Sequence, residues 1–246
     1  MRKLFGIYFL LMFLSYTSSA QENWGGGVDN DEVHFGFGFQ FSNTEFKLFK
    51  NPNWQIPFPD PDNGGVPLTS PLVSISSPMS SGFGLGFITD VRLGNHVNFR
   101  ATPALVFADR FIDYTYQNTA DNTRKIVQTA TVDLPLGFKL KSDRRRNFRA
   151  YVLGGVKYSI DIISKKKLND ADLGQLDKLV KTNRNILWYE AGVGFDFYFE
   201  FFKLSPEIKW SQSVNNVLAS NSSPNAYSTP LEKLFLRNFQ FSLYFE

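Results

Sequence analysis

The chain has no cysteine among its 246 residues. This absence excludes disulfide bonds, thiolate catalysis, cysteine-based zinc sites and an acylated N-terminal cysteine. Histidine is also scarce: His34 and His96 are the only two. Since small hydrolytic sites commonly combine a histidine with a serine and a carboxylate, the chain offers little for such chemistry. We expect no catalytic residue, no metal site and no cofactor.

The chain also lacks a large net charge of either sign. The formal charge of +3 falls to +1 when Arg2 and Lys3 are set aside, because the first twenty residues contain no acid. A nearly balanced chain gives no electrostatic reason to expect nucleic-acid binding. No small-molecule substrate is evident either.

Long apolar runs are absent after Ala20. The first twenty residues combine the basic pair at positions 2 and 3, an apolar stretch from Leu4 to Leu14, and small residues up to Ala20. This is the pattern of a cleaved signal peptide, and the stretch is shorter than the roughly 20 apolar residues that a membrane anchor needs. Any later membrane insertion would therefore use strands.

Phenylalanine is abundant, with 26 residues, and in several segments it occupies every second position. The clearest segment places Phe35, Phe37, Phe39 and Phe41 between Gly36, Gly38, Gln40 and Ser42. A period of two sends successive side chains to opposite faces of a β-strand. Eight segments alternate in this way: 35–42, 82–87, 97–107, 132–139, 149–161, 187–199, 203–210 and 239–246.

The connections between these segments alternate between short and long. Short ones fall at 94–95, at 142–147 and near Phe201, and long polar ones at 51–79, 116–123, 164–183 and 213–232. Outer-membrane barrels have short periplasmic turns and longer extracellular loops. The sequence thus predicts an all-β fold: an eight-stranded antiparallel up-and-down transmembrane β-barrel over residues 33–246, after a signal peptide (1–20) and a periplasmic segment (21–32).

One long loop is expected to contain a short helix. Asn169 is its candidate cap, and Leu173, Leu176, Leu179 and Val180 form one apolar stripe.

Alternation alone does not distinguish a membrane barrel, apolar outside, from a soluble barrel, apolar inside. Here the polar face carries mostly glycine with small polar residues, which suits a crowded interior, so we expect the phenylalanines to face lipid. The charges on the inward face have both signs, and buried charges need partners. We therefore predict a structural network of ion pairs in the lumen, formed by Arg100, Asp133, Lys157, Glu190, Asp196, Glu207 and Lys209.

Two further features lead to expectations about the wall. Aromatic residues near strand ends predict the two interfacial girdles: Tyr114, Tyr189, Phe199, Phe201 and Phe202. Pro135 and Pro206 lie inside predicted strands and cannot donate to the ladder, so bulges are expected there.

Two segments are candidates for partner contacts. The loop 51–79 contains seven of the twelve prolines, and Trp54 and Phe58 could serve as apolar anchors. The turn Arg144, Arg145 and Arg146 could bind an acidic partner or a lipid phosphate in the periplasm. The alternatives are a loop stiffened against proteases and a merely solvated turn.

The central segment Val132–Lys141 reads VDLPLGFKLK, is followed by an arginine-rich turn, and continues as YVLGGVKYS from Tyr151 to Ser159. With the Ser-Ser-Ala-Gln-Glu sequence at residues 18–22 and the Phe-Gly-Phe-Gly-Phe strand, it resembles the PorT family of outer-membrane barrels from Bacteroidetes, which includes the gliding-motility counterpart SprT. The resemblance implies a component of the type IX secretion system, with outer-membrane lipid and other secretion components as partners. It supplies no catalytic residue.

An eight-stranded barrel has an interior just wide enough for its own side chains, so we expect it to act through loops, turns or wall rather than as a pore. A generic structural or adhesive barrel is the alternative, and a lipid-modifying membrane enzyme is a weaker one.

Overall fold

The computed structural model describes residues 31–61, 63–163, 174–219 and 225–246. Within them the chain forms one antiparallel sheet and a single 3-10 helix, η1 (Thr119–Asp121). The strands are β1 (Val33–Lys50), β2 (Leu72–Ser76), β3 (Ser80–Arg92), β4 (Val97–Ala101), β5 (Ala104–Tyr116), β6 (Thr123–Lys141), β7 (Phe148–Asp161), β8 (Asn185–Tyr198), β9 (Lys203–Ser213) and β10 (Leu231–Phe245). No helix of the described part is long and apolar enough to span a membrane.

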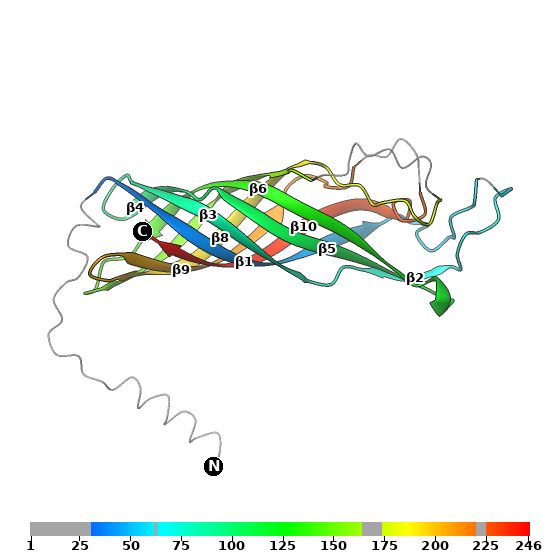
Figure 1. Ribbon diagram of the computed structural model, residues 1–246, viewed down its shortest axis with the longest axis horizontal. Helices are drawn as coiled ribbons and strands as arrows, with labels where there is room; N and C mark the ends of the chain where they lie inside the picture. The colour runs from blue at the N-terminus through cyan, green and yellow to red at the C-terminus, as the bar shows by residue number, and fades with distance from the viewer. Residues whose placement is uncertain (1–30, 62, 164–173, 220–224) are drawn as a thin grey trace, which may run out of the picture.

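The sheet closes into a barrel because β1 pairs with β10 on one side and with β3 on the other. We call each strand position around the barrel wall a stave, and two of the staves are each made of two shorter strands. Strands β2 and β3 both pair with β5, and β4 and β5 both pair with β6. The ten strands of the described residues therefore build eight staves, which confirms the predicted barrel (Figure 1).

Several predicted details are wrong. The third predicted strand is broken at Thr102 and Pro103, where the Thr102 amide donates to the carbonyl of Pro135 at 3.2 Å. The predicted loop 51–79 contains β2, so the connection itself spans 51–71. Pro135 and Pro206 create no bulge, because the strand register continues unchanged on both sides of each. Pro135 lies opposite the β4–β5 break, where the ladder needs no amide from it.

The predicted helix is also not found where it can be checked. Asn169 and Leu173, like the predicted signal peptide, lie outside the described residues. Gln175–Asp177 forms a turn, and Leu179 and Val180 lie in irregular chain. The helical residues of the described part are those of η1, in a different loop.

The two ends of the barrel differ. The turns 93–96, 142–147 and 199–202 lie at the end where β1 begins and β10 ends, which we call the short-turn end. The connections that follow β1, β5, β7 and β9 lie at the opposite, long-loop end, where the structure describes 51–61, 63–71, 117–122, 162–163, 174–184, 214–219 and 225–230 (Figure 1). This alternation of short and long connections agrees with the sequence prediction.

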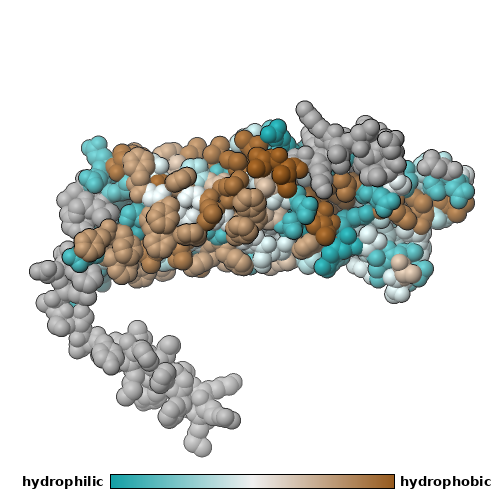
Figure 2. Space-filling model, viewed as in Figure 1, coloured by the Kyte–Doolittle hydropathy of each residue, from teal (hydrophilic) through white to brown (hydrophobic). Residues whose placement is uncertain are grey.

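The outer wall of the short-turn half is an apolar band. Phe35, Phe37 and Phe39 are 71%, 51% and 50% exposed, whereas Gln40 and Ser42 are buried in the lumen. Figure 2 shows the apolar side chains gathered over this half of the wall. The phenylalanine row thus faces outward, and a soluble barrel with an apolar interior is excluded for this half.

The faces exchange their character toward the long-loop end. On β1, beyond Ser42, the inward positions become apolar with Phe46 and Leu48, while Glu45 and Lys47 point outward. Strand β6 has 19 residues, whereas a membrane-spanning strand needs about 9 to 11. The barrel therefore continues past the apolar band, and there β1 has charged residues on its outer face and apolar residues in the lumen, as a strand of a water-soluble barrel does.

This division predicts position-dependent effects of an outward arginine on one strand. Phe39→Arg should weaken folding into phosphatidylcholine vesicles by about 2–4 kcal/mol, because a cation in the middle of the apolar band meets hydrocarbon. The matched control is Phe49→Arg, on the same face of β1 but beyond the band, which should cost about 0–1 kcal/mol. Urea titration of vesicle-inserted protein measures both, and equal costs would contradict the division.

Candidate functional site: the filled lumen and its ends

The lumen near the short-turn end is filled by seven charged side chains, which we call the short-turn cluster. They come from six staves and are at most 6% exposed: Asp90, Arg100, Lys139, Asp196, Lys203, Glu207 and Glu246. Six of them lie on the inward face of their strands, because the period-two alternation that exposes the apolar residues points every second residue inward, and Glu246 directly follows β10.

Arg100 is the hub of this cluster. Its Nη2 and Nε donate to Asp90 Oδ2 at 2.6 and 3.1 Å, and its Nη1 donates to Glu207 Oε2 at 3.0 Å. Nη2 is also 3.4 Å from Glu246 Oε1. The Tyr151 hydroxyl donates to the same Glu207 oxygen at 2.9 Å. One guanidinium thus joins β3, β4, β9 and the chain's last residue across the lumen.

The lysines complete the pairing. Lys139 Nζ donates to both oxygens of Asp196 at 2.8 and 2.7 Å, and Lys203 Nζ lies 2.8 Å from Glu246 Oε2. Removing a charge from water is costly unless an opposite charge and hydrogen bonds compensate it. Here each cation has an anion within contact distance, and the four carboxylates of the cluster outnumber its three cations by one.

Two further ion pairs continue along the lumen. Lys209 Nζ lies 3.4 Å from Glu207 Oε1 and 3.7 Å from Glu190 Oε1, and Lys157 Nζ lies 3.3 Å from Asp133 Oδ2. A void beside these charges measures about 10 Å³, roughly the smallest space that can hold one water molecule. The charged side chains therefore pack closely at this level.

The structure places all seven predicted lumen charges inside the barrel, each in an ion pair. Sequence reasoning missed four partners: Asp90, Lys139, Lys203 and Glu246. The alternation predicts a strand that ends at Phe87, three residues before Asp90. The other three lie on the same alternating face, so strict application of the alternation would have found them.

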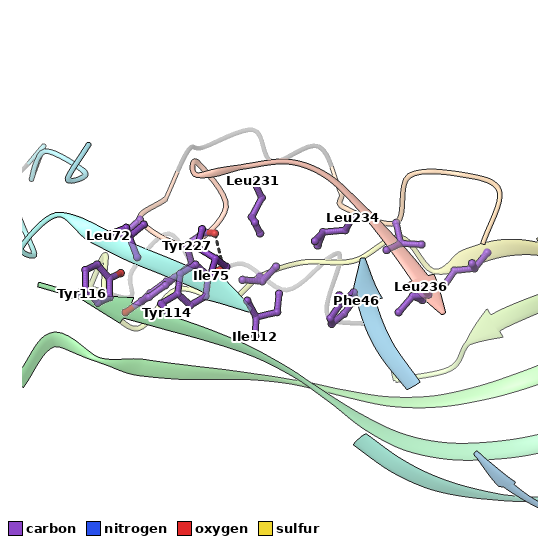
Figure 3. Close-up of a cluster of buried hydrophobic side chains, with 14 of the residues drawn as sticks. Phe46, Leu72, Ile75, Ile112, Tyr114, Tyr116, Tyr227, Leu231, Leu234 and Leu236 are labelled. Carbon is purple, nitrogen blue, oxygen red and sulfur yellow. Dashed lines mark hydrogen bonds between the residues drawn. The ribbon is translucent and has the colours of Figure 1, made fainter. Parts of the chain in front are cut away.

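The long-loop half of the lumen is filled by apolar side chains, which we call the long-loop cluster (Figure 3). Its buried members are Phe46, Leu72, Ile75, Ile112, Tyr114, Tyr116, Val180, Ile186, Trp188, Val217, Ala226, Tyr227, Leu231, Leu234 and Leu236. The Tyr114 hydroxyl donates to the Tyr227 carbonyl at 2.7 Å, which ties β5 to the β9–β10 loop. Tyr114 is thus buried in the lumen and is not part of an interfacial girdle, because it lies on the inward face of β5.

Trp54 and Phe58, the candidate loop anchors, pack half-buried against the long-loop cluster. Lys50 Nζ lies 4.0 Å from the centre of the Trp54 ring. Part of the apolar surface of these two residues is therefore used inside the protein itself.

The long loops are also tied to one another. Asp121 Oδ2 accepts hydrogen bonds from the Ser70 amide and hydroxyl at 2.9 and 2.8 Å, and these bonds lower the pKa of the Asp121 carboxyl. Asn51 Nδ2 donates to the Thr229 carbonyl at 2.7 Å. These contacts join the loops 51–71, 117–122 and 214–230 across the long-loop end.

The arginine turn at the short-turn end is held in a defined shape. Arg144 lies over the Tyr198 ring at 3.8 Å, and its Nε donates to the Arg146 carbonyl at 2.7 Å. Arg146 has a positive φ of 56°, and both Arg145 and Arg146 are exposed. The turn therefore presents two guanidinium groups to solvent.

The two histidines do not form an evident reaction centre. His34 is buried at the start of β1, whereas His96 is exposed in a short turn, with its Nε2 3.8 Å from Asp143 Oδ1. No group of three or more acidic or histidine side chains that could hold a metal ion occurs among the described residues.

The contrast between buried and exposed ion pairs yields a prediction. Arg100→Met should lower the free energy of unfolding by about 3–5 kcal/mol, because it leaves Asp90 and Glu207 buried without compensation. The matched control is Arg124→Met, which removes an exposed pair with Asp113 (2.6 Å) and should lower the free energy of unfolding far less, because water already screens that pair. Urea unfolding in detergent micelles measures both. A small cost at Arg100 would show that the cluster is solvated.

The sequence matches the family described as "Outer membrane protein beta-barrel domain" over residues 6–219. Among solved structures, it is similar to OprG from Pseudomonas aeruginosa, with 12% identity, a TM-score of 0.44, and coverage of 87% of this chain and 92% of that one. It is also similar to the Neisserial surface protein A, with 6% identity, a TM-score of 0.39, and coverage of 87% and 98%. No curated protein matches. Since the family match spans most of a chain that folds as a closed barrel with an apolar outer band, this protein belongs to the outer membrane protein beta-barrel domain family and resides in the outer membrane.

Proposed function

We propose that the protein is a non-enzymatic accessory or docking component of the type IX protein secretion system, which exports surface and secreted cargo and serves gliding motility. The observation that carries the mode of action is the filled lumen: ion pairs occupy one half and the long-loop cluster the other. Because an eight-stave barrel is just wide enough for its own side chains to fill, the protein acts through its turns, its loops and its wall.

The pathway itself rests on the sequence resemblance to the PorT family. That resemblance is strongest from Val132 to Asp161, which forms the second half of β6, the arginine turn and β7. Asp133, Lys139 and Lys157 of this segment contribute to the lumen ion pairs, so part of the resemblance is accounted for by the packing of the barrel. The turn between the two strands is exposed and faces the periplasm in the orientation expected of short turns.

Two surfaces are proposed for docking. On the periplasmic side, Arg145 and Arg146 could bind an acidic protein segment through bidentate hydrogen bonds. On the outer side, the loop 51–71 exposes Ile56 and Val66, 64% and 55% exposed. Since Trp54 and Phe58 are half-buried against the barrel, their role would be to hold this loop in place as well as to contact a partner.

A generic structural or adhesive barrel is the second candidate. It is favoured by the loop-to-loop hydrogen bonds at the long-loop end, which build a stable platform that needs no partner to order it. A lipid-modifying enzyme has less support, because His96 is exposed in a turn and His34 is buried at the start of β1.

Deletion of the gene in its own bacterium tests the secretion role. We expect cargo proteins to be lost from the cell surface, and complementation with the intact gene to restore them. The double substitution Arg145→Glu and Arg146→Glu should reduce surface cargo and the recovery of crosslinked secretion components, while barrel assembly stays normal. Asp109→Lys, an exposed charge reversal on the outer half, is the matched control. Unchanged surface cargo in the deletion strain would favour the structural or adhesive barrel.

The filled lumen predicts that the protein does not conduct ions. Purified protein inserted in planar lipid bilayers should show no conductance steps, because neither the ion-pair half nor the apolar half provides a continuous water path. A large-pore outer-membrane porin serves as the positive control. Stable, large currents from the intact protein would contradict the proposal that it works without a pore.

A further inference from the structure

A hollow of about 480 Å³ lies in the outer wall, at the edge of the apolar band nearest the long-loop end. It crosses β9, β10 and β1 and reaches the start of β3. Its lining residues are Asn43, Glu45, Met79, Trp210, Arg237, Asn238 and Phe239. In one cross-strand row Phe239 faces Trp210 and Asn43, and in the next row toward the long loops Arg237 faces Glu45. The hollow is therefore apolar on one side and charged on the other.

The shape of the hollow follows from the sequence of β1. Phenylalanines occupy the outward positions 35, 37, 39 and 41, but the next outward position is Asn43. A small side chain thus lies where the row would otherwise continue with a ring. Its neighbours Phe239 and Met79 are large and remain exposed at 50% and 65%. The gap between them is open to the membrane.

The hollow lies at the level of lipid headgroups. The Trp210 and Tyr189 rings, 5.5 Å apart and both exposed, lie beside it, and tryptophan and tyrosine concentrate at membrane–water boundaries. Toward the short turns the wall is apolar, and toward the long loops it becomes charged. Because the long loops of an outer-membrane barrel lie outside, this boundary belongs to the outer leaflet.

Arg237 has unused binding capacity at this level. Its Nη1 is 3.7 Å from Glu45 Oε1, which is too far for a hydrogen bond. Its Nε is shielded from solvent and has no hydrogen-bond partner among the described residues. Asn43 accepts from Ser81 through Oδ1 at 2.9 Å, which leaves its amide nitrogen as a donor. A guanidinium fork beside an amide donor matches the oxygens of a phosphate group.

The charges around the hollow also favour an anion. Lys47 and Lys233 are on the same two strands, farther toward the loops, and the nearby acids are Glu45 and Glu232. Together with Arg237 these groups carry a small positive excess. Basic residues at a membrane surface attract anionic headgroups, and the attraction adds to the apolar burial of the chains.

We propose that this hollow binds a phosphate-bearing lipid of the outer leaflet. Arg237 and Asn43 hold the phosphate, and Trp210 and Phe239 support the acyl chains below it. The site needs neither the secretion role nor a protein partner, so the two proposals stand or fall separately.

Native mass spectrometry of the intact protein in detergent tests the site. The probe is lipid A carrying phosphate, compared with the same lipid after enzymatic removal of its phosphate. We expect the phosphorylated lipid to give the stronger adduct, and Arg237→Gln to weaken that adduct about tenfold, since a charge-assisted bidentate contact is lost. Arg124→Gln, an exposed arginine on the opposite stave pair β5–β6, is the matched control and should leave the adduct unchanged.

A second variant separates binding from general charge effects. Asn43→Phe completes the phenylalanine row and fills the hollow, so it should abolish the adduct while the net charge stays the same. Heat-dependent mobility on gels verifies that each variant forms the barrel. The proposal is overturned if the dephosphorylated lipid binds as well, if Arg124→Gln weakens the adduct as much as Arg237→Gln does, or if Asn43→Phe binds normally.

Discussion

The narrow, closed cylinder of eight staves is the constraint on which the rest of the structure depends. Its interior has room for side chains and little else, so every inward position must be filled, and every inward charge must meet an opposite charge across the lumen. Arg100 shows this most clearly, because one guanidinium reaches carboxylates from β3, from β9 and from the last residue of the chain. The cluster joins segments that are far apart in sequence, so it also fixes which strands close the barrel.

A second consequence of the fold is the exchange of inner and outer character along β1, β5 and β10. Near the short turns the wall faces lipid and the lumen is polar, whereas near the long loops these strands point charged residues outward and apolar residues into the lumen. The same alternation of period two produces both halves, and only the assignment of apolar residues to one face or the other changes. The boundary runs across the β1–β10 pair at Asn43, Glu45 and Arg237, which is also where the wall is hollowed.

A barrel filled in this way has its surfaces available for function and its lumen reserved for stability. The arginine turn on the periplasmic side, the loop 51–71 on the outer side and the hollow at the outer-leaflet level are three separate surfaces with different chemistry. The first presents cations to water, the second presents apolar side chains held by a packed base, and the third combines a guanidinium with aromatic rings. Each is presented on a rigid scaffold, because the ion pairs and the long-loop cluster lock the staves together.

Much of this was available from the sequence by itself. The alternation determined the staves, the outward phenylalanine row, the inward position of Arg100, Asp133 and Glu207, and the order of short and long connections, because a period of two is a local property. Tertiary structure alone decided which charges meet, that Asp90 and Glu246 share Arg100, that Tyr114 points into the lumen, and that Trp54 and Phe58 pack against their own barrel. These depend on stagger and closure between strands distant in the chain, and no local period encodes that geometry.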